Sequence, residues 1–271
     1  MKNNLIFQYL ILDSNVNTRP KVNGLSRKQL YSKTGDISRR SFEKYAELVG
    51  ADYQFATDRY VSKDHDNYRA YFFEVLRIIY DPQFEQYDDI LFTDCDVVAN
   101  TNENIFDLFD GEVAAVLESD HNKNTNFKRF NSKHFLNKDF CCIADKYKAF
   151  DAPIVPTLPP NVPHKLININ TGVMVWSKEA RLKARKTFDS WVEWLFHSPT
   201  EPLWLKLDQY FISAMLVKYD FDMQFLDTTW NDSPFTPEYP IFDSNFIHYT
   251  GGDWKLLMLE HHEQNKFKIL Q

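Results

Sequence analysis

Two carboxylates stand one residue apart directly after an apolar run. The run is Ile-Leu-Phe at residues 90–92, and Asp94 and Asp96 follow it. Such a run predicts a buried strand, and open α/β sheets bind ligands in the crevice at the carboxyl ends of their strands. Carboxylate oxygens suit Mg²⁺ or Mn²⁺, which take one or two of them together with phosphate oxygens of a substrate. The pair therefore indicates a metal-bridged diphosphate site, although Asp is also common in ordinary turns.

A second group of candidate residues stands near the end of the chain. His248 follows an apolar run and precedes Gly251, Gly252 and Lys255. A neutral imidazole suits a transition-type divalent ion, and bare glycine backbone with an ammonium group suits phosphate oxygens. His248 is therefore a candidate metal ligand, with a buried, hydrogen-bonded histidine as the structural alternative.

Another acidic pair has the same spacing as the first. Asp220 and Asp222 alternate with Phe221 and Met223, so they fall on the polar side of a predicted strand. We interpret this second pair as a solvated face rather than a metal site.

The elements that must position these residues alternate between strands and helices. Apolar runs predict strands at 5–12, 51–56, 90–92, 112–117, 166–177, 221–225 and 246–249. Helical spacing predicts helices at 38–49, 68–79, 104–109, 178–196 and 203–216 and in the tail from 256. Residues 16–34 look irregular. The alternation predicts an α/β fold with a mainly parallel central sheet in a single domain, 1–271.

One long segment has no clear periodicity. Residues 121–163 are rich in Asn, Lys and Phe, and five prolines stand between Pro153 and Pro163. A long loop inside a compact domain is usually functional, so we expect a lid over the site.

Composition excludes several classes of protein. A net charge of −7 argues against a nucleic-acid surface, and no apolar run reaches the length of a membrane span. Only seven glycines occur, none in a phosphate-loop pattern, so a bound nucleotide needs a metal and side chains instead. Three cysteines form no bridging framework, so we expect the reducing cytoplasm.

The order of these motifs resembles the GT-A glycosyltransferases, in particular the retaining family that contains glycogenin and the bacterial lipooligosaccharide galactosyltransferases. The likeness covers about residues 68–255. It lies in Ile-Leu-Phe-Thr-Asp-Cys-Asp-Val-Val (90–98), Asn-Thr-Gly-Val-Met-Val (170–175), Asp208-Gln209 and His-Tyr-Thr-Gly-Gly-Asp-Trp-Lys (248–255). The resemblance implies a GT-A fold. It also implies metal-dependent transfer of a sugar from a nucleotide-sugar, with UDP-sugars as the expected donors, to a glycan or other hydroxyl acceptor with retention of configuration.

The resemblance also implies roles for the metal-site residues. Asp94, Asp96 and His248 would bind Mn²⁺ or Mg²⁺, and Lys255 would contact the donor diphosphate. The family has Pro-Trp after this lysine, whereas here Trp254 precedes it.

Further donor contacts are implied in the same way. Arg69 matches an arginine on the helix before the metal strand, and Arg77 is the alternative because Arg69 stands unusually far from Asp94. Asp120 and Asn170 match positions that bind the donor sugar.

The remaining implied residues concern the base and the reacting carbon. Gln8, Tyr9 and Asp13 are candidate base contacts, but the family's Thr-x-Asp-x-x-Tyr signature is missing, which leaves UDP and GDP open. Asp208 and Gln209 match the pair beneath the anomeric carbon and are the predicted catalytic residues.

Two other classes of function fit parts of the sequence. The run Asp-Cys-Asp-Val-Val at 94–98 also fits the nucleophile motif of haloacid-dehalogenase-like phosphatases, in which Asp94 would attack phosphorus. That motif normally opens a chain, whereas here it stands a third of the way in. A catalytically silent sugar-binding GT-A protein is the other alternative.

Overall fold

The computed structural model describes residues 2–12, 23–117, 169–197, 207–233, 241–251 and 254–271. The predicted lid at 121–163 therefore lies outside the described residues, as do Asp13, Asp120 and Gly252.

A six-stranded sheet forms the centre of the described chain, with strand order β2-β1-β3-β6-β5-β7. All neighbouring strands pair in parallel except β6, which is antiparallel to both β3 and β5. The strands are β1 (Asn4–Tyr9), β2 (Asp52–Ala56), β3 (Asp89–Thr93), β5 (Val113–Leu117), β6 (Ile169–Ser177) and β7 (Met223–Phe225). The predicted α/β fold with a mainly parallel sheet is confirmed.

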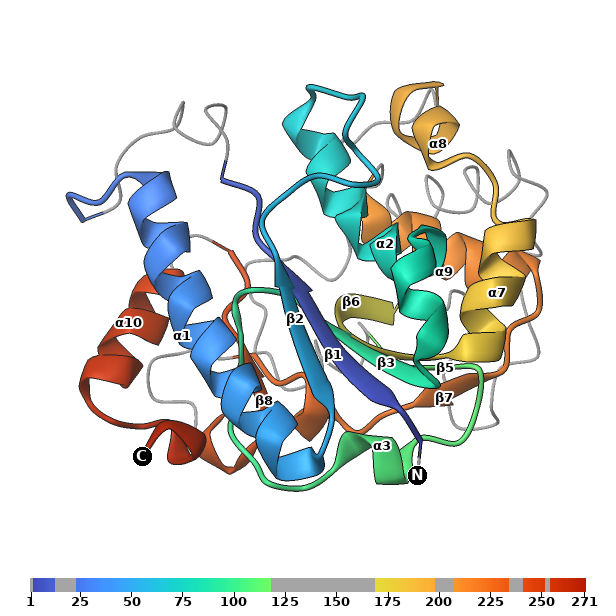
Figure 1. Cartoon of the computed structure of the whole chain (residues 1–271). Coiled ribbons are helices and arrows are strands. Elements are labelled where there is room, and N and C mark those ends of the chain that lie inside the picture. The colour runs from blue at the N-terminus through green and yellow to red at the C-terminus, as the bar shows by residue number, and fades with distance from the viewer. Residues whose placement is uncertain (1, 13–22, 118–168, 198–206, 234–240, 252–253) are drawn as a thin grey trace, which may run out of the picture.

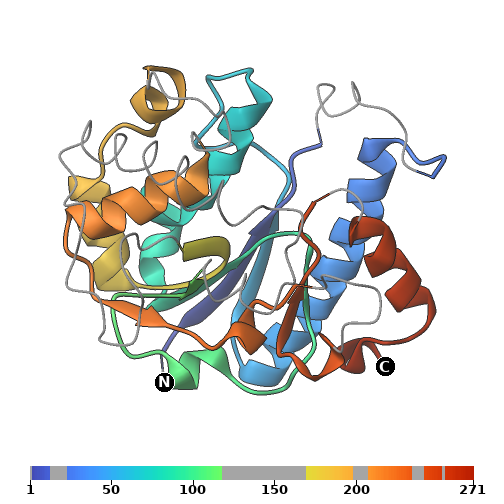
Figure 2. The same ribbon diagram turned by 180° about the vertical axis from the view of Figure 1, so that it is seen from behind.

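Helices cover both faces of this sheet (Figures 1 and 2). One face packs against η2 (Tyr68–Leu76), α2 (Arg77–Tyr80), α7 (Lys178–Thr187), α8 (Trp191–His197) and α9 (Asp208–Lys218). The other face packs against α1 (Arg27–Val49), α3 (Ile105–Leu108) and the small sheet of β4 (Val97–Ala99) and β8 (Phe246–His248), with α10 (Trp254–Glu263) beyond.

Side-chain alternation explains why both faces are buried. Successive strand residues point to opposite faces, and Ile90 and Phe92 of β3 join the core on the α9 side while Leu91 joins the core on the α1 side. A strand buried on both faces reads as a continuous apolar run, which is the pattern that marked β3 in the sequence.

Helix α1 is longer than the sequence predicted. It begins at Arg27 rather than near residue 38, so the interpretation of residues 27–34 as irregular was wrong. Ser26 accepts a hydrogen bond from the backbone N–H of Gln29, whose side chain bonds back to Ser26, and this capping box starts the helix. The predicted end is confirmed, since Gly50 takes the left-handed conformation with φ 69°.

Two other predicted helices are divided. Residues 68–79 form the 3-10 helix η2 followed by the short α2, and residues 178–196 form α7 and α8 with a break at Phe188. Glu74 of η2 turns inward and accepts hydrogen bonds from the backbone N–H groups of Tyr60, Val61 and Ser62. That long-range bonding fixes η2 by tertiary contacts that helical spacing does not reveal.

Candidate functional site

The predicted metal residues converge at a point where the chain changes sheets. Strand β3 ends at Thr93, Asp94 to Asp96 form a turn, and β4 then leaves the central sheet to pair with β8. In that pairing Val97 lies opposite His248, and the N–H of Tyr249 donates to the Asp96 carbonyl at 2.9 Å. The antiparallel ladder therefore brings two distant parts of the chain together.

The side chains of these residues face one another. His248 Nε2 lies 3.3 Å from Asp96 Oδ1 and 3.8 Å from Asp94 Oδ2. One ligand atom from each residue can be chosen so that all lie within 4.8 Å of one another. His248 and Asp96 are largely buried, whereas the Asp94 side chain is 39% exposed. Two carboxylates and an imidazole form a donor set that fits Mn²⁺ or Mg²⁺.

Lys255 completes the charged cluster from the first turn of α10. Its ammonium pairs with Asp96 Oδ2 and lies 5.3 Å from the centre of the Tyr31 ring. Burial alone would raise the pKa of Asp96, but the adjacent Lys255 and His248 outweigh it and hold that pKa low. Burial and the charge of Asp96 raise the pKa of Asp94 to about 6.

Gln8 supports the turn at residues 94–96, which carries the two carboxylates. Its Nε2 donates to the Asp94 carbonyl at 3.1 Å and to Ser38 Oγ at 2.8 Å, while its Oε1 accepts from Tyr53 at 2.7 Å. Ser38 in turn donates to the Val97 carbonyl. Both ends of the fully buried Gln8 side chain are thus engaged within the protein. A contact of Gln8 with the base stays a prediction.

The two candidate arginines differ in their surroundings. Arg77 is buried and bonds to Asp81 at 3.0 Å and to Asp58 at 3.1 Å. Arg69 is half-buried, and its guanidinium lies 5.5 Å from the ring centre of Tyr68. Arg77 is thereby committed to a structural ion-pair network, so Arg69 is the better candidate for a donor contact.

The predicted catalytic pair begins α9 beside β6. Thr171 of β6 donates to Asp208 Oδ2 at 2.9 Å, and the carbonyl of Gln209 accepts from Ser213 one turn on. Burial, followed by the charge of Asp94, raises the pKa of Asp208 to about 7. The charge of Asp94 thus adds to the effect of burial on the Asp208 pKa.

Tyr9, another predicted base contact, is half-buried at the end of β1. Burial and the charges of Asp94 and Asp208 raise its pKa well above the ordinary value. Its ring stacks on Phe92 with centres 5.8 Å apart, and its hydroxyl donates to the Phe72 carbonyl at 3.2 Å.

Two residues of the site were missed from the sequence. A Cβ added to Gly172 would lie 2.2 Å from Cε1 of His248, so only glycine lets β6 approach the imidazole this closely. Asn231 is fully buried, and its Oδ1 lies 2.8 Å from His248 Nδ1. The Asn-x-Gly sequence hinted at Gly172, but no spacing pattern marked Asn231. The predicted donor residue Asn170 shares this wall, where its Oδ1 accepts from the N–H of Gly172 at 2.9 Å.

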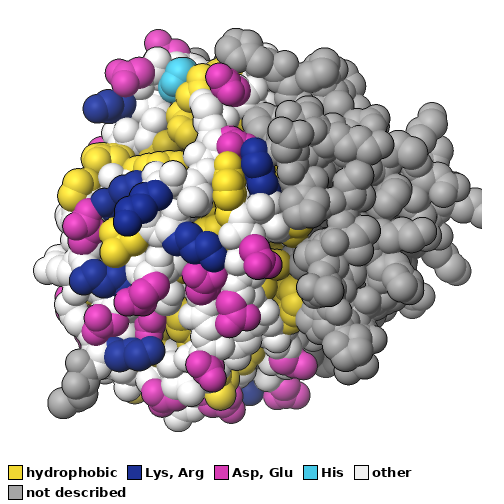
Figure 3. Space-filling view, turned by 90° about the vertical axis from the view of Figure 1, so that its right-hand side faces the viewer, with side chains coloured by type: hydrophobic (Ala, Val, Ile, Leu, Met, Phe, Trp, Pro, Cys, Tyr) yellow, Lys and Arg dark blue, Asp and Glu magenta, His cyan; other side chains and the backbone are white. Residues whose placement is uncertain are grey.

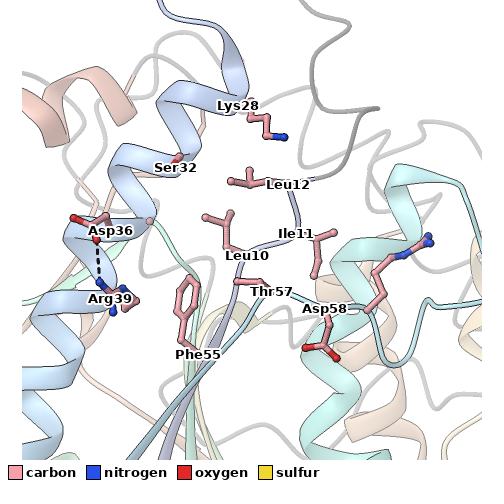
Figure 4. Close-up of a pocket in the computed structure, with 12 residues that line it drawn as sticks. Leu10, Ile11, Leu12, Lys28, Ser32, Asp36, Arg39, Phe55, Thr57 and Asp58 are labelled. Atoms are coloured by element: carbon pink, nitrogen blue, oxygen red, sulfur yellow. Dashed lines mark hydrogen bonds and ion pairs between the residues drawn. The ribbon is translucent and has the colours of Figure 1, made fainter.

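A hollow of about 620 Å³ opens beside the carboxyl ends of β1 and β2 (Figure 4). Leu10 and Leu12 line it from the chain after β1, Phe55 lines it from β2, and Ser32 and Arg39 line it from α1. Gly35 lines the same hollow, one turn of α1 before Ser38, whose hydroxyl donates to the Val97 carbonyl just after the two carboxylates. The hollow and the carboxylate site therefore share the same end of the sheet.

Of the predicted Gly-Gly pair, Gly251 is exposed with φ 82°.

Two surface properties accompany the site. On the described part of the face shown in Figure 3, Lys and Arg side chains are interspersed with Asp and Glu. Among the described residues, none of the helices combines the length and apolar character that crossing a membrane requires.

Comparison with known proteins shows what the fold is. No family model matches the chain, and no curated protein matches it by sequence. Solved structures do match it. A glycosyltransferase involved in the glycosylation of the major capsid of PBCV-1 superposes with a TM-score of 0.53 at 16% identity, covering 97% of this chain and 99% of that one.

Two further structures are similar. The bifunctional glycosyltransferase WbbM has a TM-score of 0.55 at 14% identity over 99% of this chain, which spans 52% of WbbM. The galactosyltransferase LgtC, in complex with donor and acceptor sugar analogues, has a TM-score of 0.47 at 12% identity. The chain has the GT-A glycosyltransferase fold, as the resemblance of its motifs implied.

Proposed function

We propose that this protein is a metal-dependent glycosyltransferase that moves a sugar from a nucleotide-sugar, a UDP-sugar by preference, to a hydroxyl of a glycan or other acceptor. The observation that carries this proposal is the convergence of Asp94, Asp96 and His248 at the carboxyl end of the central strand β3 in a GT-A fold. The carboxylate oxygens suit Mn²⁺ and Mg²⁺, and the imidazole favours a transition-type ion such as Mn²⁺.

The residues around the cluster divide the chemistry between them. A divalent ion, when bound, would supply positive charge to the diphosphate oxygens of the donor. Lys255 adds a buried ammonium beside Asp96, which would stabilise the negative charge that develops on the leaving diphosphate. Gln209 and Asp208, at the start of α9, would stabilise positive charge that develops on the sugar.

The hollow beside β1 is the proposed site of the nucleoside. It combines apolar side chains, Leu10 and Phe55, with polar groups such as Ser32 and Arg39, and its volume of about 620 Å³ suits a small-molecule site. A nucleoside there would extend its diphosphate toward the neighbouring β3, where the two carboxylates stand.

Retention of the anomeric configuration is the proposed stereochemical course. An inverting enzyme needs a carboxylate base beside the acceptor hydroxyl. The negative charge of Asp94 instead raises the pKa of Asp208, which accepts a hydrogen bond from Thr171. Both observations favour a role on the donor side. The phosphatase alternative would use Asp94 as nucleophile but gives no role to His248, and it is not proposed.

The test measures nucleoside diphosphate release from a panel of UDP- and GDP-sugars. We expect activity with Mn²⁺, loss of activity in excess chelator, and recovery when Mn²⁺ is restored. His248→Ala should lose most turnover, whereas His262→Ala, a half-buried histidine of α10, should not. Full activity in excess chelator would contradict the metal requirement, and absence of release with every donor would favour a silent sugar-binding protein. Proton NMR of the first-formed product from an α-linked donor should show an α-linked product.

A further inference from the structure

A continuous row of hydrogen bonds joins the backbone of β6 to the imidazole of His248. The N–H of Gly172 donates to Asn170 Oδ1 at 2.9 Å. Asn231 Nδ2 lies 2.8 Å from that same oxygen, and Asn231 Oδ1 lies 2.8 Å from His248 Nδ1. All four residues are buried or lie in the buried strand β6, so water does not substitute for these bonds.

The first bond in the row fixes the direction of all the others. A backbone N–H can only donate, so the atom of Asn170 that faces Gly172 must be the amide oxygen. The atom of Asn231 that faces this oxygen must then be its NH₂ group, which turns its own oxygen toward His248. An amide oxygen can only accept, and the Nδ1 of His248 must therefore carry a hydrogen.

We propose that Asn231 is a positioning residue that holds His248 in the Nδ1–H tautomer, so that the Nε2 lone pair faces Asp94 and Asp96. This inference rests on the proposed role of His248 as a metal ligand. A neutral imidazole carries one hydrogen, so a proton held on Nδ1 leaves Nε2 as the electron-pair donor. Nε2 is the ring nitrogen that lies 3.3 Å from Asp96 Oδ1, within the proposed metal site.

The close packing of β6 supports the same assignment. A Cβ on residue 172 would lie 2.2 Å from Cε1 and 2.7 Å from Nδ1 of His248. The imidazole is thus held edge-on against the Gly172 backbone, with Asn231 as the hydrogen-bond partner of Nδ1. Histidine ligands of metals commonly donate their second ring N–H to such a partner, and loss of the partner typically costs 10–100-fold in metal affinity.

The most direct test is the tautomer itself in the unaltered protein. Long-range ¹H–¹⁵N NMR of the ¹⁵N-histidine-labelled chain, in chelator and at a pH where imidazoles are neutral, should show His248 protonated on Nδ1. Assignment comes from the loss of this signal in His248→Ala. A neutral His248 with its hydrogen on Nε2 and none on Nδ1 would overturn the proposal, and this result does not depend on how any Asn231 variant folds.

Metal affinity supplies the second test. Asn231→Leu should weaken Mn²⁺ binding by about 10–100-fold in calorimetric titration. The matched control is Asn100→Leu. Asn100 is a similarly buried asparagine whose side chain bonds to the backbone of Phe242, Ser244 and Lys268 rather than to His248.

The outcomes separate this inference from the proposed function. If Asn231→Leu binds Mn²⁺ as tightly as the unaltered chain, or if Asn100→Leu loses as much affinity, Asn231 has only a structural role and the inference fails. If the unaltered chain itself does not bind Mn²⁺, the proposed function fails, while the tautomer measurement still decides which hydrogen-bond direction His248 adopts.

Discussion

The protein contains two Asp-x-Asp sequences, and their surroundings are opposite. Asp94 and Asp96 follow the central strand β3 at its carboxyl end and face a histidine and a lysine. Asp220 and Asp222 are exposed and precede the edge strand β7 at its amino end. In a parallel sheet, strands present their carboxyl ends to the ligand crevice. Position in the sheet, rather than residue spacing, therefore separates a candidate metal site from a solvated turn.

The cations near the two pairs are used differently. Lys255 is buried and pairs directly with a carboxylate of the first pair. Near the second pair, Lys183 pairs with Glu112 at 2.8 Å. Its contact with Asp220 is to the backbone carbonyl. The first arrangement concentrates charge in a buried cluster, where electrostatic interactions are strong, whereas the second leaves its carboxylates to solvent.

The largest predicted effect is at Gly172, the glycine beside the first acidic pair. Gly172→Ala should reduce turnover by about 100-fold or more, because its Cβ would lie 2.2 Å from His248 and must displace the imidazole or β6. Gly111→Ala is the matched control, since its nearest contact would be the Asp222 carbonyl at an ordinary 3.7 Å. Turnover and circular dichroism of both variants check this. Equal turnover of the two variants would contradict the predicted difference between Gly172 and Gly111.

A smaller effect is predicted at the hollow beside the first pair. Ser32→Trp on α1 should fill part of the hollow and raise the KM for the donor by about 10-fold, with Mn²⁺ affinity unchanged. Lys44→Trp, at an exposed position on the same helix outside the hollow, serves as the control. Steady-state kinetics with the preferred nucleotide-sugar measure the difference. An unchanged KM in Ser32→Trp would contradict the proposed binding of the nucleoside in this hollow.

The smallest predicted effect is on stability and depends on pH. The pKa of Asp208 is raised to about 7 in the folded chain, whereas an unfolded Asp titrates near ~4. Between these values the unfolded state loses its proton first, so this residue makes folding less favourable as pH rises from about 4 to 7, and the full cost persists above that range. Asp208→Asn removes the cost and keeps an oxygen for Thr171.

The measurement is thermal unfolding of the chelated protein at two pH values. Asp208→Asn should raise the unfolding temperature by about 2–4 °C at pH 8, corresponding to ~1 kcal/mol after allowance for solvent screening, and by less at pH 4.5. The control is Asp222→Asn, whose exposed carboxylate should matter little at either pH. A gain at pH 4.5 as large as that at pH 8 would contradict the titration of Asp208.

Sequence patterns predicted the parts of this molecule that depend on local signals. The apolar run of β3, the glycine end of α1 and the mainly parallel sheet followed from periodicity and turn residues. The grouping of the two carboxylates with His248 came from the order of motifs. Local polarity misled the prediction at residues 27–34, where the Ser26–Gln29 capping box outweighs a weak apolar pattern.

The supporting residues of the site could not be predicted in the same way. Gln8 and Ser38 bond to the backbone of Asp94 and Val97 and so link β1 and α1 to the segment that carries the two carboxylates, and Asn231 reaches His248 from a separate loop. Such contacts join residues far apart in the chain and leave no periodic trace.

The central claim is that the first acidic pair, and not the second, is a metal site, and Mn²⁺ titration calorimetry tests it most directly. The unaltered chain and the Asp220→Asn, Asp222→Asn double variant should bind one Mn²⁺ with affinities within about 2-fold of each other. The Asp94→Asn, Asp96→Asn double variant should remain folded and lose at least about 100-fold in affinity. Unchanged Mn²⁺ binding by the Asp94, Asp96 variant would contradict the account.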